Sequence, residues 1–253
     1  MKKYAIIGDI HAELNQLLKM IEKIKEEKAE PIFVGDLVDR GKNSKEVVQF
    51  VIDNNYKCVM GNHEESMVDM YEILKFIKEN GESKNFLDDI IRWVNVSGFD
   101  NTLESYGIAK VVFENNKKTE LNLNLHDENF ILFEKHINWI KKLPTYITLN
   151  DIHIKDKKVI ISHSSISGVW DMKNLYSIED FESNIRWNRE KPKDIKGIYN
   201  IFGHSEIGSK SFFSNDGDFT SPMVTEYFTN VDTSCGKDGF LTSILIPEMK
   251  VIY

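Results

Sequence analysis

Short apolar runs alternate with amphipathic helical patterns along the first third of the chain. The runs at 2–7, 31–34 and 56–60 are predicted strands, because each is apolar and each leads into a turn. Between them, apolar residues recur at helical spacing over 14–28 and over 44–54. Strands and helices in this order predict a βαβαβ arrangement, with parallel strands and right-handed crossovers.

The pattern changes after residue 65, where helical spacing continues without strands between the helices. Apolar positions mark predicted helices near 67–77, 86–94, 100–106 and 130–140. The acidic and asparagine-rich stretch 114–127 is interpreted as a surface loop or an irregular segment. We therefore expect residues from about 65 to 142 to form a helical cap inserted into one domain.

The last part of the chain is rich in β-type patterns. The runs 145–149 and 158–163 are predicted to pair as a hairpin around the charged turn 151–157. Further strands are predicted at 198–204, 226–232 and 241–246. The chain as a whole is interpreted as one α/β domain, residues 1–253, because 253 residues with 41% hydrophobic content can bury a large core.

Charge and cysteine content narrow the class of protein. A formal net charge of −8 argues against a sequence-independent grip on nucleic acid, although local arginines can still bind phosphorylated substrates. Cys58 and Cys235 lie in apolar segments and are interpreted as buried free thiols. The N-terminal apolar run is too short for a signal peptide, and no stretch approaches the roughly 20 apolar residues of a membrane span. We expect a cytoplasmic protein without membrane attachment.

Polar side chains stand where the predicted strands end. The first three strands lead into GDIH (8–11), GDLVDRG (35–41) and GNHEE (61–65), and two later strands end in histidine. Each residue alone could be a helix cap, a turn residue or a strand-end histidine with ordinary partners. Together they are better explained by a metal site at the strand tips. The six candidate ligands are Asp9, His11, Asp36, Asn62, His163 and His204.

Six ligands exceed what one tetrahedral zinc requires, so the pattern favours two metals that share a bridging carboxylate. A metal pair can hold a hydroxide and clamp a phosphoryl oxygen for in-line displacement. His63 lies beside a presumed ligand, and Asp39 and Arg40 follow Asp36 closely enough to line the same pocket.

The motifs GDIH, GDLVDRG, GNHEE, ISH and FGH, in this order, resemble those of metallophosphoesterases of the phosphoprotein phosphatase family. Among them, the motifs resemble those of lambda-type bacterial and phage Ser/Thr protein phosphatases. HINWIKKLP, WNRE and VDTSCGKDGFLT extend the resemblance over essentially the whole chain. The resemblance implies a sandwich of two mixed β-sheets flanked by helices, with the site at the strand tips.

The resemblance also implies roles for individual residues. Asp9, His11 and Asp36 would hold the first metal, and Asp36, Asn62, His163 and His204 the second. His63 would be the general acid, oriented by Asp39, while Arg40 and Arg189 would bind the phosphate, a bidentate task that suits guanidinium. Manganese is the favoured metal, with iron, zinc and nickel as alternatives. The expected substrate is a phosphorylated protein or a small phosphoester, and no nucleic-acid partner is expected.

Some positions depart from the family pattern, in the neighbourhood of the substrate pocket. Ala12 replaces a usual glycine, and Met60 stands where arginine is common. Ser164 and Ser165 replace a small Ala-Gly pair, and Ser234 stands where glycine usually follows Asp-Thr. None of these changes removes a predicted ligand.

Several alternatives stay open from the sequence alone. Asp39 and Arg40 could form a plain surface pair, and Arg189 could belong to a solvated charged run. The four tryptophans are expected to pack in the core or cap. A dinucleoside tetraphosphate hydrolase of the same superfamily is the main rival, although those enzymes tend to carry Asp where this chain has Glu64 and to lack Asp39. A nucleic-acid end phosphatase or phosphodiesterase and a non-catalytic scaffold are the other rivals.

Overall fold

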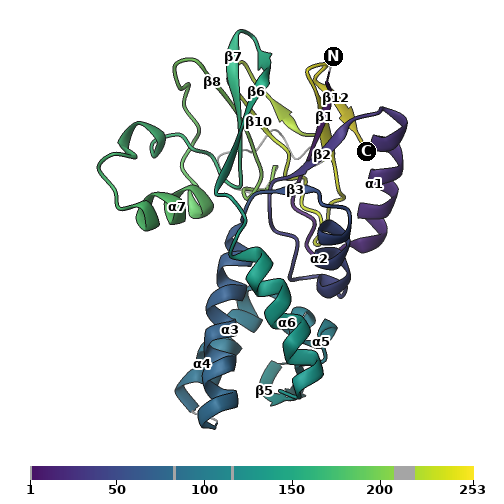
Figure 1. The fold of residues 1–253 in the computed structure, drawn as a ribbon, viewed down its shortest axis with the longest axis vertical. Coiled ribbons are helices and arrows are strands. Elements are labelled where there is room, and N and C mark those ends of the chain that lie inside the picture. Colours follow the sequence, from purple (N-terminus) through teal and green to yellow (C-terminus); the bar gives the residue numbers. More distant parts are fainter. Residues whose placement is uncertain (1, 82–83, 115–116, 208–219) are drawn as a thin grey trace.

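Two five-stranded sheets form the centre of the protein, and helices cover their outer faces (Figure 1). The computed structural model describes residues 2–81, 84–114, 117–207 and 220–253. The first sheet has the strand order β12-β11-β1-β2-β3, and the second has the order β6-β7-β8-β10-β9. Both sheets contain parallel and antiparallel pairs, which confirms the predicted sandwich of two mixed sheets.

The first sheet is built largely from the N-terminal third of the chain. Its elements in order are β1 (Tyr4–Ile7), α1 (Leu14–Glu26), β2 (Glu30–Phe33), α2 (Ser44–Asp53) and β3 (Lys57–Cys58). The three strands are parallel to one another, as the alternation of strands and helices predicts. The C-terminal strands β11 (Ser243–Ile246) and β12 (Lys250–Ile252) complete the sheet, with β11 antiparallel to β1.

The second sheet comes from the C-terminal half of the chain. Its strands are β6 (Tyr146–Ile154), β7 (Lys157–Ser162), β8 (Ile198–Phe202), β9 (Met223–Val224) and β10 (Phe228–Asn230). The predicted hairpin between β6 and β7 is present, but its turn is shorter than expected because β6 continues through a register shift to Ile154. The short 3-10 helix η1 (Trp170–Met172) and helix α7 (Ile178–Trp187) stand between β7 and β8.

The alternation of side chains along β1 explains how the layers pack. Tyr4 and Ile6 point into the core between the sheets, whereas Ala5 and Ile7 belong to the core beneath the helices. A strand buried on both faces reads as a continuous apolar run, which is how β1 appears in the sequence. On the outer face of the second sheet, Ile160 packs with residues of α7.

Residues 62–140 form a lobe that projects away from the sheets (Figure 1). Its elements are α3 (Asn62–Asn80), α4 (Lys84–Ser97), α5 (Phe99–Ser105), β4 (Ala109–Glu114), β5 (Lys117–Leu123) and α6 (Asp127–Ile140). The prediction of an irregular segment over 114–127 is wrong, because β4 and β5 pair as an antiparallel hairpin. Asparagine is rare in strands, and it hid the alternation of Leu121 and Leu123, which pack on the core, with the exposed Asn122 and Asn124.

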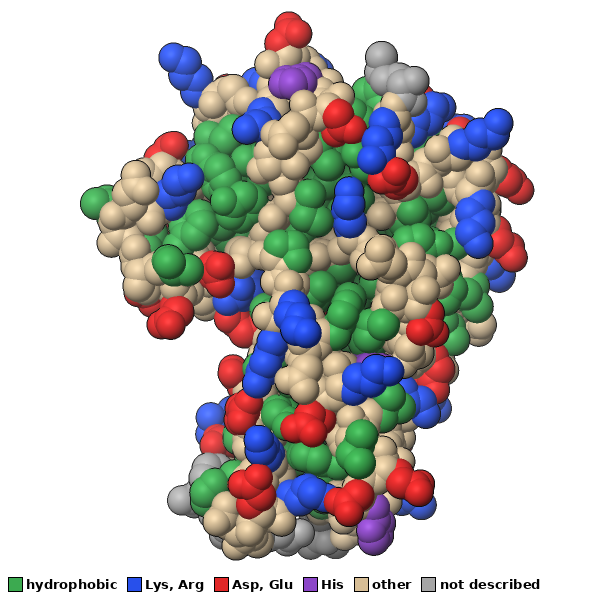
Figure 2. Space-filling model, in the orientation of Figure 1, with side chains coloured by type: hydrophobic (Ala, Val, Ile, Leu, Met, Phe, Trp, Pro, Cys, Tyr) green, Lys and Arg blue, Asp and Glu red, His purple; other side chains and the backbone are tan. Residues whose placement is uncertain are grey.

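The distribution of charged side chains and the burial of the two cysteines can be compared with the composition. Acidic and basic side chains are interspersed over the sandwich and over the projecting lobe on the face shown in Figure 2. Cys58 and Cys235 are buried free thiols, as predicted. Over the described part of the chain, no helix is both long and apolar enough to cross a bilayer.

Candidate metal centre

The predicted ligands meet at one edge of the two sheets, because each follows a strand that ends there. Asp9 and His11 follow β1, Asp36 follows β2, and Asn62 follows β3, all in the first sheet. His163 and His204 follow the parallel strands β7 and β8 of the second sheet. The edge at the carboxyl ends of parallel strands is where α/β folds commonly hold ligands.

Asn62 and His63 differ in one respect from the prediction that they project from a strand tip. They are the first two residues of α3, and β3 ends four residues earlier, at Cys58. The Gly61 backbone turns directly into the helix, and a Cβ at Gly61 would overlap the Asp36 carboxylate. The glycine of this motif therefore allows the helix start to lie against Asp36.

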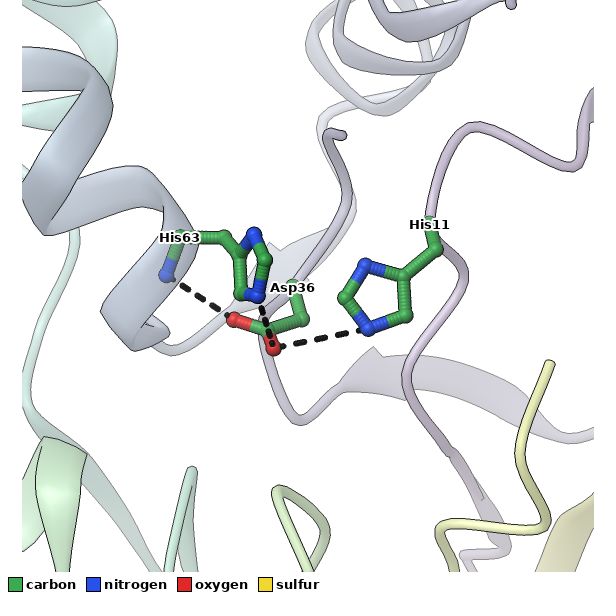
Figure 3. Close-up of side chains that lie close together, drawn as sticks. All are labelled: His11, Asp36 and His63. Carbon is green, nitrogen blue, oxygen red and sulfur yellow. Dashed lines mark hydrogen bonds and ion pairs between the residues drawn. The ribbon is translucent and has the colours of Figure 1, made fainter. Parts of the chain in front are cut away.

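Asp36 lies at the centre of the cluster. One group of possible ligands is His11, Asp36 and His63, the other is Asp36, His163 and His204, and within each group the ligand atoms lie within 4.8 Å of one another. Asp36 Oδ2 is 3.6 Å from His11 Nε2, and Oδ1 is 3.3 Å from His163 Nε2 (Figure 3 shows the His11 side). Asp36 thus occupies the position that a bridging carboxylate needs.

The remaining two predicted ligands are Asn62, which borders the second group, and Asp9, whose carboxylate is held by the backbone of His204. Asn62 Oδ1 is 2.9 Å from His163 Nε2. The Asp9 carboxylate accepts the backbone N–H of His204, at 3.1 and 3.2 Å to its two oxygens. A Cβ at Gly203 would overlap that carboxylate, which explains the glycine before His204. All six predicted ligands are thus brought together in one buried cluster.

The protonation of two histidines tests whether the cluster suits a cation. His11 Nδ1 is 3.0 Å from the Val38 carbonyl, and His163 Nδ1 is 2.8 Å from the Val34 carbonyl. A carbonyl can only accept, so Nδ1 carries the proton in both rings and each Nε2 presents a lone pair to Asp36. Histidine ligands of metals are held by backbone carbonyls in the same way. A divalent cation could therefore be held between each of these lone pairs and the Asp36 carboxylate.

The pKa shifts agree with this assignment. Burial lowers the pKa of His163 and lowers that of His11 far below the ordinary value, so both rings stay neutral. Burial raises the pKa of Asp36, but the surrounding imidazoles lower it more, so the net pKa lies below the ordinary range. Burial and the charges of Asp232 and Asp36 raise the pKa of Asp9 well above its usual value. Asp9 therefore needs a nearby positive charge to remain ionised.

His63 faces the cluster but has a different partner. Its Nδ1 lies 2.7 Å from Asp39 Oδ2. Its Nε2 lies 3.8 Å from Asp36 Oδ2, the contact drawn in Figure 3. Asp39 is fully buried, and Trp93 packs against the His63 ring with centroids 5.5 Å apart. Burial lowers the pKa of His63, yet the charges of Asp36 and Asp39 outweigh it, and the net pKa is raised. The ring can therefore hold a proton at Nε2.

Glu64 is a structural support that we did not predict. Its fully buried carboxylate accepts the backbone N–H groups of Asp36 at 2.8 Å, Leu37 at 2.7 Å and Gly61 at 2.9 Å. Burial and the charge of Asp36 raise the pKa of Glu64 to about 7, although the three amides oppose that rise. Glu64 ties the turn after β2 to the start of α3. The signal in the sequence was its place three residues into a helix, where Glu commonly caps.

A cleft of about 420 Å³ opens onto Asn62 and His63. Arg40 and Arg189, the two residues predicted to bind phosphate, both line this cleft together with His63. Arg40 Nη1 lies 3.5 Å from Glu206, and Arg189 Nη1 donates to the His204 carbonyl at 3.2 Å. Arg189 is nevertheless exposed, so its assignment to phosphate binding stays a prediction.

Further residues that the sequence did not single out as site residues also line this cleft. Lys237 adds a third cation, and Trp93 and Trp187 form an aromatic wall, with ring centroids 6.3 Å apart. The expectation that the tryptophans pack in the core or cap is confirmed for Trp93, which packs against the core as well as lining the cleft, but Trp187 is exposed at the cleft. The two tryptophans come from α4 and from the end of α7. These helices are far apart in the sequence, and the tertiary structure brings them together.

The departures from the family pattern leave the ligand atoms clear. Ser164 Oγ donates to the Ile185 carbonyl and accepts the Asn188 N–H at 3.1 Å, so it fixes the end of α7 next to Arg189. Ala12 has φ 60° and Ser234 has φ 62°, conformations that glycine adopts without strain.

Left-handed backbone is concentrated in the loops of the cluster. Such conformations are costly for residues with a side chain and persist where the surrounding structure holds them. The site residues with positive φ are His11, Asp36, Asp39, Arg40 and His204, all between 47° and 70°.

Comparison with known proteins shows that the chain resembles members of a phosphoesterase family. The sequence profile of the calcineurin-like phosphoesterase family matches residues 2–229. A symmetrical bis(5'-nucleosyl)-tetraphosphatase of Buchnera aphidicola subsp. Baizongia pistaciae is 24% identical over 210 residues, 81% of this chain, but the match spans only 58% of that relative. The serine/threonine-protein phosphatase with EF-hands 1 of Rattus norvegicus is 27% identical over 78% of this chain and 31% of its own length.

A solved structure confirms the fold. The crystal structure of a putative diadenosine tetraphosphatase superimposes with a TM-score of 0.58 over 99% of this chain and 92% of that chain, at 15% sequence identity. The same sandwich therefore forms from very different sequences.

Proposed function

Because the chain belongs to the calcineurin-like phosphoesterase family, we propose that it is a metal-dependent phosphomonoesterase acting on phosphoserine or phosphothreonine in proteins. The observation that carries the proposal is the position of Asp36 between two groups of ligands, with the His63–Asp39 pair facing it. This arrangement combines a place for two cations with a proton donor for the leaving group.

The donor set fits two divalent cations, with Asp36 shared by both. Asp9 and His11 would complete the first site, and the other side would be completed by Asn62, His163 and His204. Bound cations would supply positive charge for the phosphoryl oxygens and lower the pKa of water. Mixed imidazole and carboxylate donors suit manganese, which we favour, as well as iron, zinc and nickel.

The chain's own residues then serve the leaving group and the phosphate. His63 would hold a proton at Nε2 for the departing serine or threonine oxygen, because Asp39 occupies its Nδ1. Arg40 and Arg189 line the cleft beside His63 and would stabilise the charge spread over the phosphoryl oxygens. Serine alkoxide is a poor leaving group, so this proton matters most for alkyl phosphates.

A dinucleoside tetraphosphate is the second candidate substrate, and the wall of Trp93 and Trp187 favours it. Flat aromatic side chains beside cations suit a nucleobase next to phosphates. The tetraphosphatase relative points the same way. Glu64 and Asp39 argue for the protein phosphatase instead, on the resemblance described above.

A substrate panel tests the proposal. The protein would be assayed with manganese against a phosphoserine peptide, diadenosine tetraphosphate and a phosphodiester, each with Trp187→Leu in parallel. We expect the highest kcat/KM on the phosphopeptide and little change in Trp187→Leu. Preference for the dinucleotide, with a selective loss in Trp187→Leu, would establish the second candidate. No hydrolysis of any phosphoester would refute the proposed function.

A further inference from the structure

Helix α5 of the inserted lobe contacts the turn that carries Asp39 and Arg40. Asn101 Nδ2 donates to the Arg40 carbonyl at 2.5 Å, and a Cβ at Gly98 would lie 3.0 Å from Arg40 Cα. Thr102 Oγ1 lies 2.6 Å from Asp39 Oδ1. The lobe therefore meets the site at two consecutive residues, one of which is the partner of His63.

Hydrogen-bond geometry fixes the direction of each bond around Thr102. An ionised carboxylate can only accept, so the single hydroxyl proton of Thr102 goes to Asp39 Oδ1. Ser44 Oγ lies 2.8 Å from Thr102 Oγ1 and must then be the donor in that pair. The Asp39 N–H donates to the same two hydroxyls, at 3.0 Å to Thr102 and 3.2 Å to Ser44.

These bonds continue without a break to the proposed acid. Thr102 holds Oδ1 of Asp39, which leaves Oδ2 to accept from His63 Nδ1 at 2.7 Å. Ser44, Asp39 and Thr102 are all fully buried, so water does not compete for these bonds. The carboxylate is thus fixed in one rotamer, and the His63 ring in one orientation.

We propose that Thr102, supported by Ser44, is a positioning residue that orients the His63–Asp39 pair toward the leaving group. The inference rests on the proposed function. It assigns the inserted lobe a part in the chemistry: α5 holds the catalytic turn from outside the sandwich. The turn needs such support, because Asp39 and Arg40 both have left-handed φ, 70° and 66°.

An isosteric variant separates positioning from packing. Thr102→Val keeps the shape and removes the bond to Asp39, while Thr102→Ser keeps the hydroxyl. Thr229→Val is the matched control, because Thr229 is also fully buried and bonded, to the Tyr199 hydroxyl at 2.9 Å, but lies in the second sheet. Each would be assayed with manganese on phosphoserine and on p-nitrophenyl phosphate, with metal content and thermal midpoint measured alongside.

A p-nitrophenolate is a stable anion that needs little protonation as it leaves, so a misplaced acid should affect mainly the alkyl ester. We expect Thr102→Val to lose about ten-fold to a hundred-fold in kcat on phosphoserine, with a much smaller loss on the aryl ester and unchanged metal content. Thr102→Ser should restore phosphoserine turnover, and Thr229→Val should leave the ratio of the two rates unchanged. His63→Asn should show the same preference more strongly.

Other outcomes overturn the inference without touching the proposed function. Equal losses on both esters, or no loss, in Thr102→Val at intact metal content would make Thr102 a packing residue only. If Thr102→Val does not fold, Ser44→Ala must show the same alkyl-selective loss, and its failure to do so would overturn the inference as well. An inactive wild-type protein would instead refute the proposed function.

Discussion

At the scale of single residues, the position of Asp36 depends on a buried carboxylate outside the predicted ligand set. Glu64 accepts three backbone amides and joins the turn of Asp36 to the start of α3, where Asn62 lies. Asp36 has a left-handed φ, which residues with a side chain rarely adopt, so contacts from outside the turn must hold it in this conformation. The buried Glu64 therefore holds Asp36 in its place at the centre of the cluster.

We expect Glu64→Gln to weaken metal binding. The amide group would place a donor against backbone donors, so at least one of the three bonds would be lost and the Asp36 turn would shift. Residues that orient ligands in this way typically contribute about ten-fold to a hundred-fold in metal affinity. Metal titration of the variant would measure the loss, with Glu72→Gln on the exposed face of α3 as the control. Wild-type affinity in Glu64→Gln would contradict this role.

Arg189 is tested by its effect on turnover. A cation beside the phosphoryl oxygens acts where charge develops, so Arg189→Ala should lower kcat by about ten-fold to a thousand-fold without loss of metal. Arg40→Ala should behave similarly. Steady-state kinetics of both, with the exposed Arg92→Ala as control, would measure the effect. If Arg189→Ala matched the wild type in kcat and KM, Arg189 would belong to the solvated surface.

The convergence of the six candidate ligands could be predicted because each follows a strand in a short motif. Trp93, Trp187 and Lys237 could not, because nothing local distinguishes a tryptophan that lines a cleft from one that packs in a core. Their place depends on how α4, α7 and the C-terminal loop meet over the strand tips. Thr102 was hidden for the same reason, since it lies 63 positions from Asp39 in the chain.

At the scale of elements, prediction succeeded where hydrophobic period and composition agree. The βαβαβ order of the first third follows from apolar runs between amphipathic helices. The β4–β5 hairpin was missed because its asparagines disfavour a strand, and contact of Leu121 and Leu123 with the lobe's core outweighs that preference. The start of α3 at Asn62 was missed because Gly61 and Glu64 cap it through tertiary contacts with Asp36.

A buried histidine joins the lobe to the sandwich and should make stability depend on pH. His136 of α6 is fully buried, with Nε2 at 2.9 Å from Gln49 Oε1 of α2 and Nδ1 at 2.6 Å from the Tyr106 hydroxyl. Gln49 Oε1 accepts, so Nε2 carries the proton and Nδ1 accepts from Tyr106. Burial, more than the nearby lysines, lowers the pKa of His136 to about 4.

The sign of the effect follows from proton binding. Between pH 6.5 and 4 the unfolded chain binds a proton at His136 and the folded chain does not, so stability falls as pH falls. For this group alone we expect a loss of about 2 kcal/mol between pH 7 and pH 5. Urea denaturation of wild type and His136→Gln at both pH values would measure it, with the exposed His153→Gln as control. An equal pH dependence in all three proteins would contradict the assignment.

At the scale of the whole molecule, the candidate ligands from the two sheets converge at one edge. The first sheet contributes Asp9, His11, Asp36 and Asn62, and the second contributes His163 and His204. A cation held by both sheets would stabilise the folded state but not the unfolded chain. Manganese at about 100-fold above its Kd should therefore raise the thermal midpoint by roughly 5–10 °C over the chelated protein. A thermal midpoint that changes neither on chelation nor on addition of manganese would contradict a metal centre shared by the sheets.

The most direct test of a metal pair bridged by Asp36 is the number of metal ions per chain. Wild type, Asp9→Asn and Asp36→Asn would be loaded with manganese, desalted and analysed by elemental analysis, with folding checked by circular dichroism. We predict two ions per chain in the wild type, about one in Asp9→Asn and close to none in Asp36→Asn, because Asp36 is shared by both proposed sites whereas Asp9 belongs only to the first. Two tightly held ions in a folded Asp36→Asn protein would contradict the account.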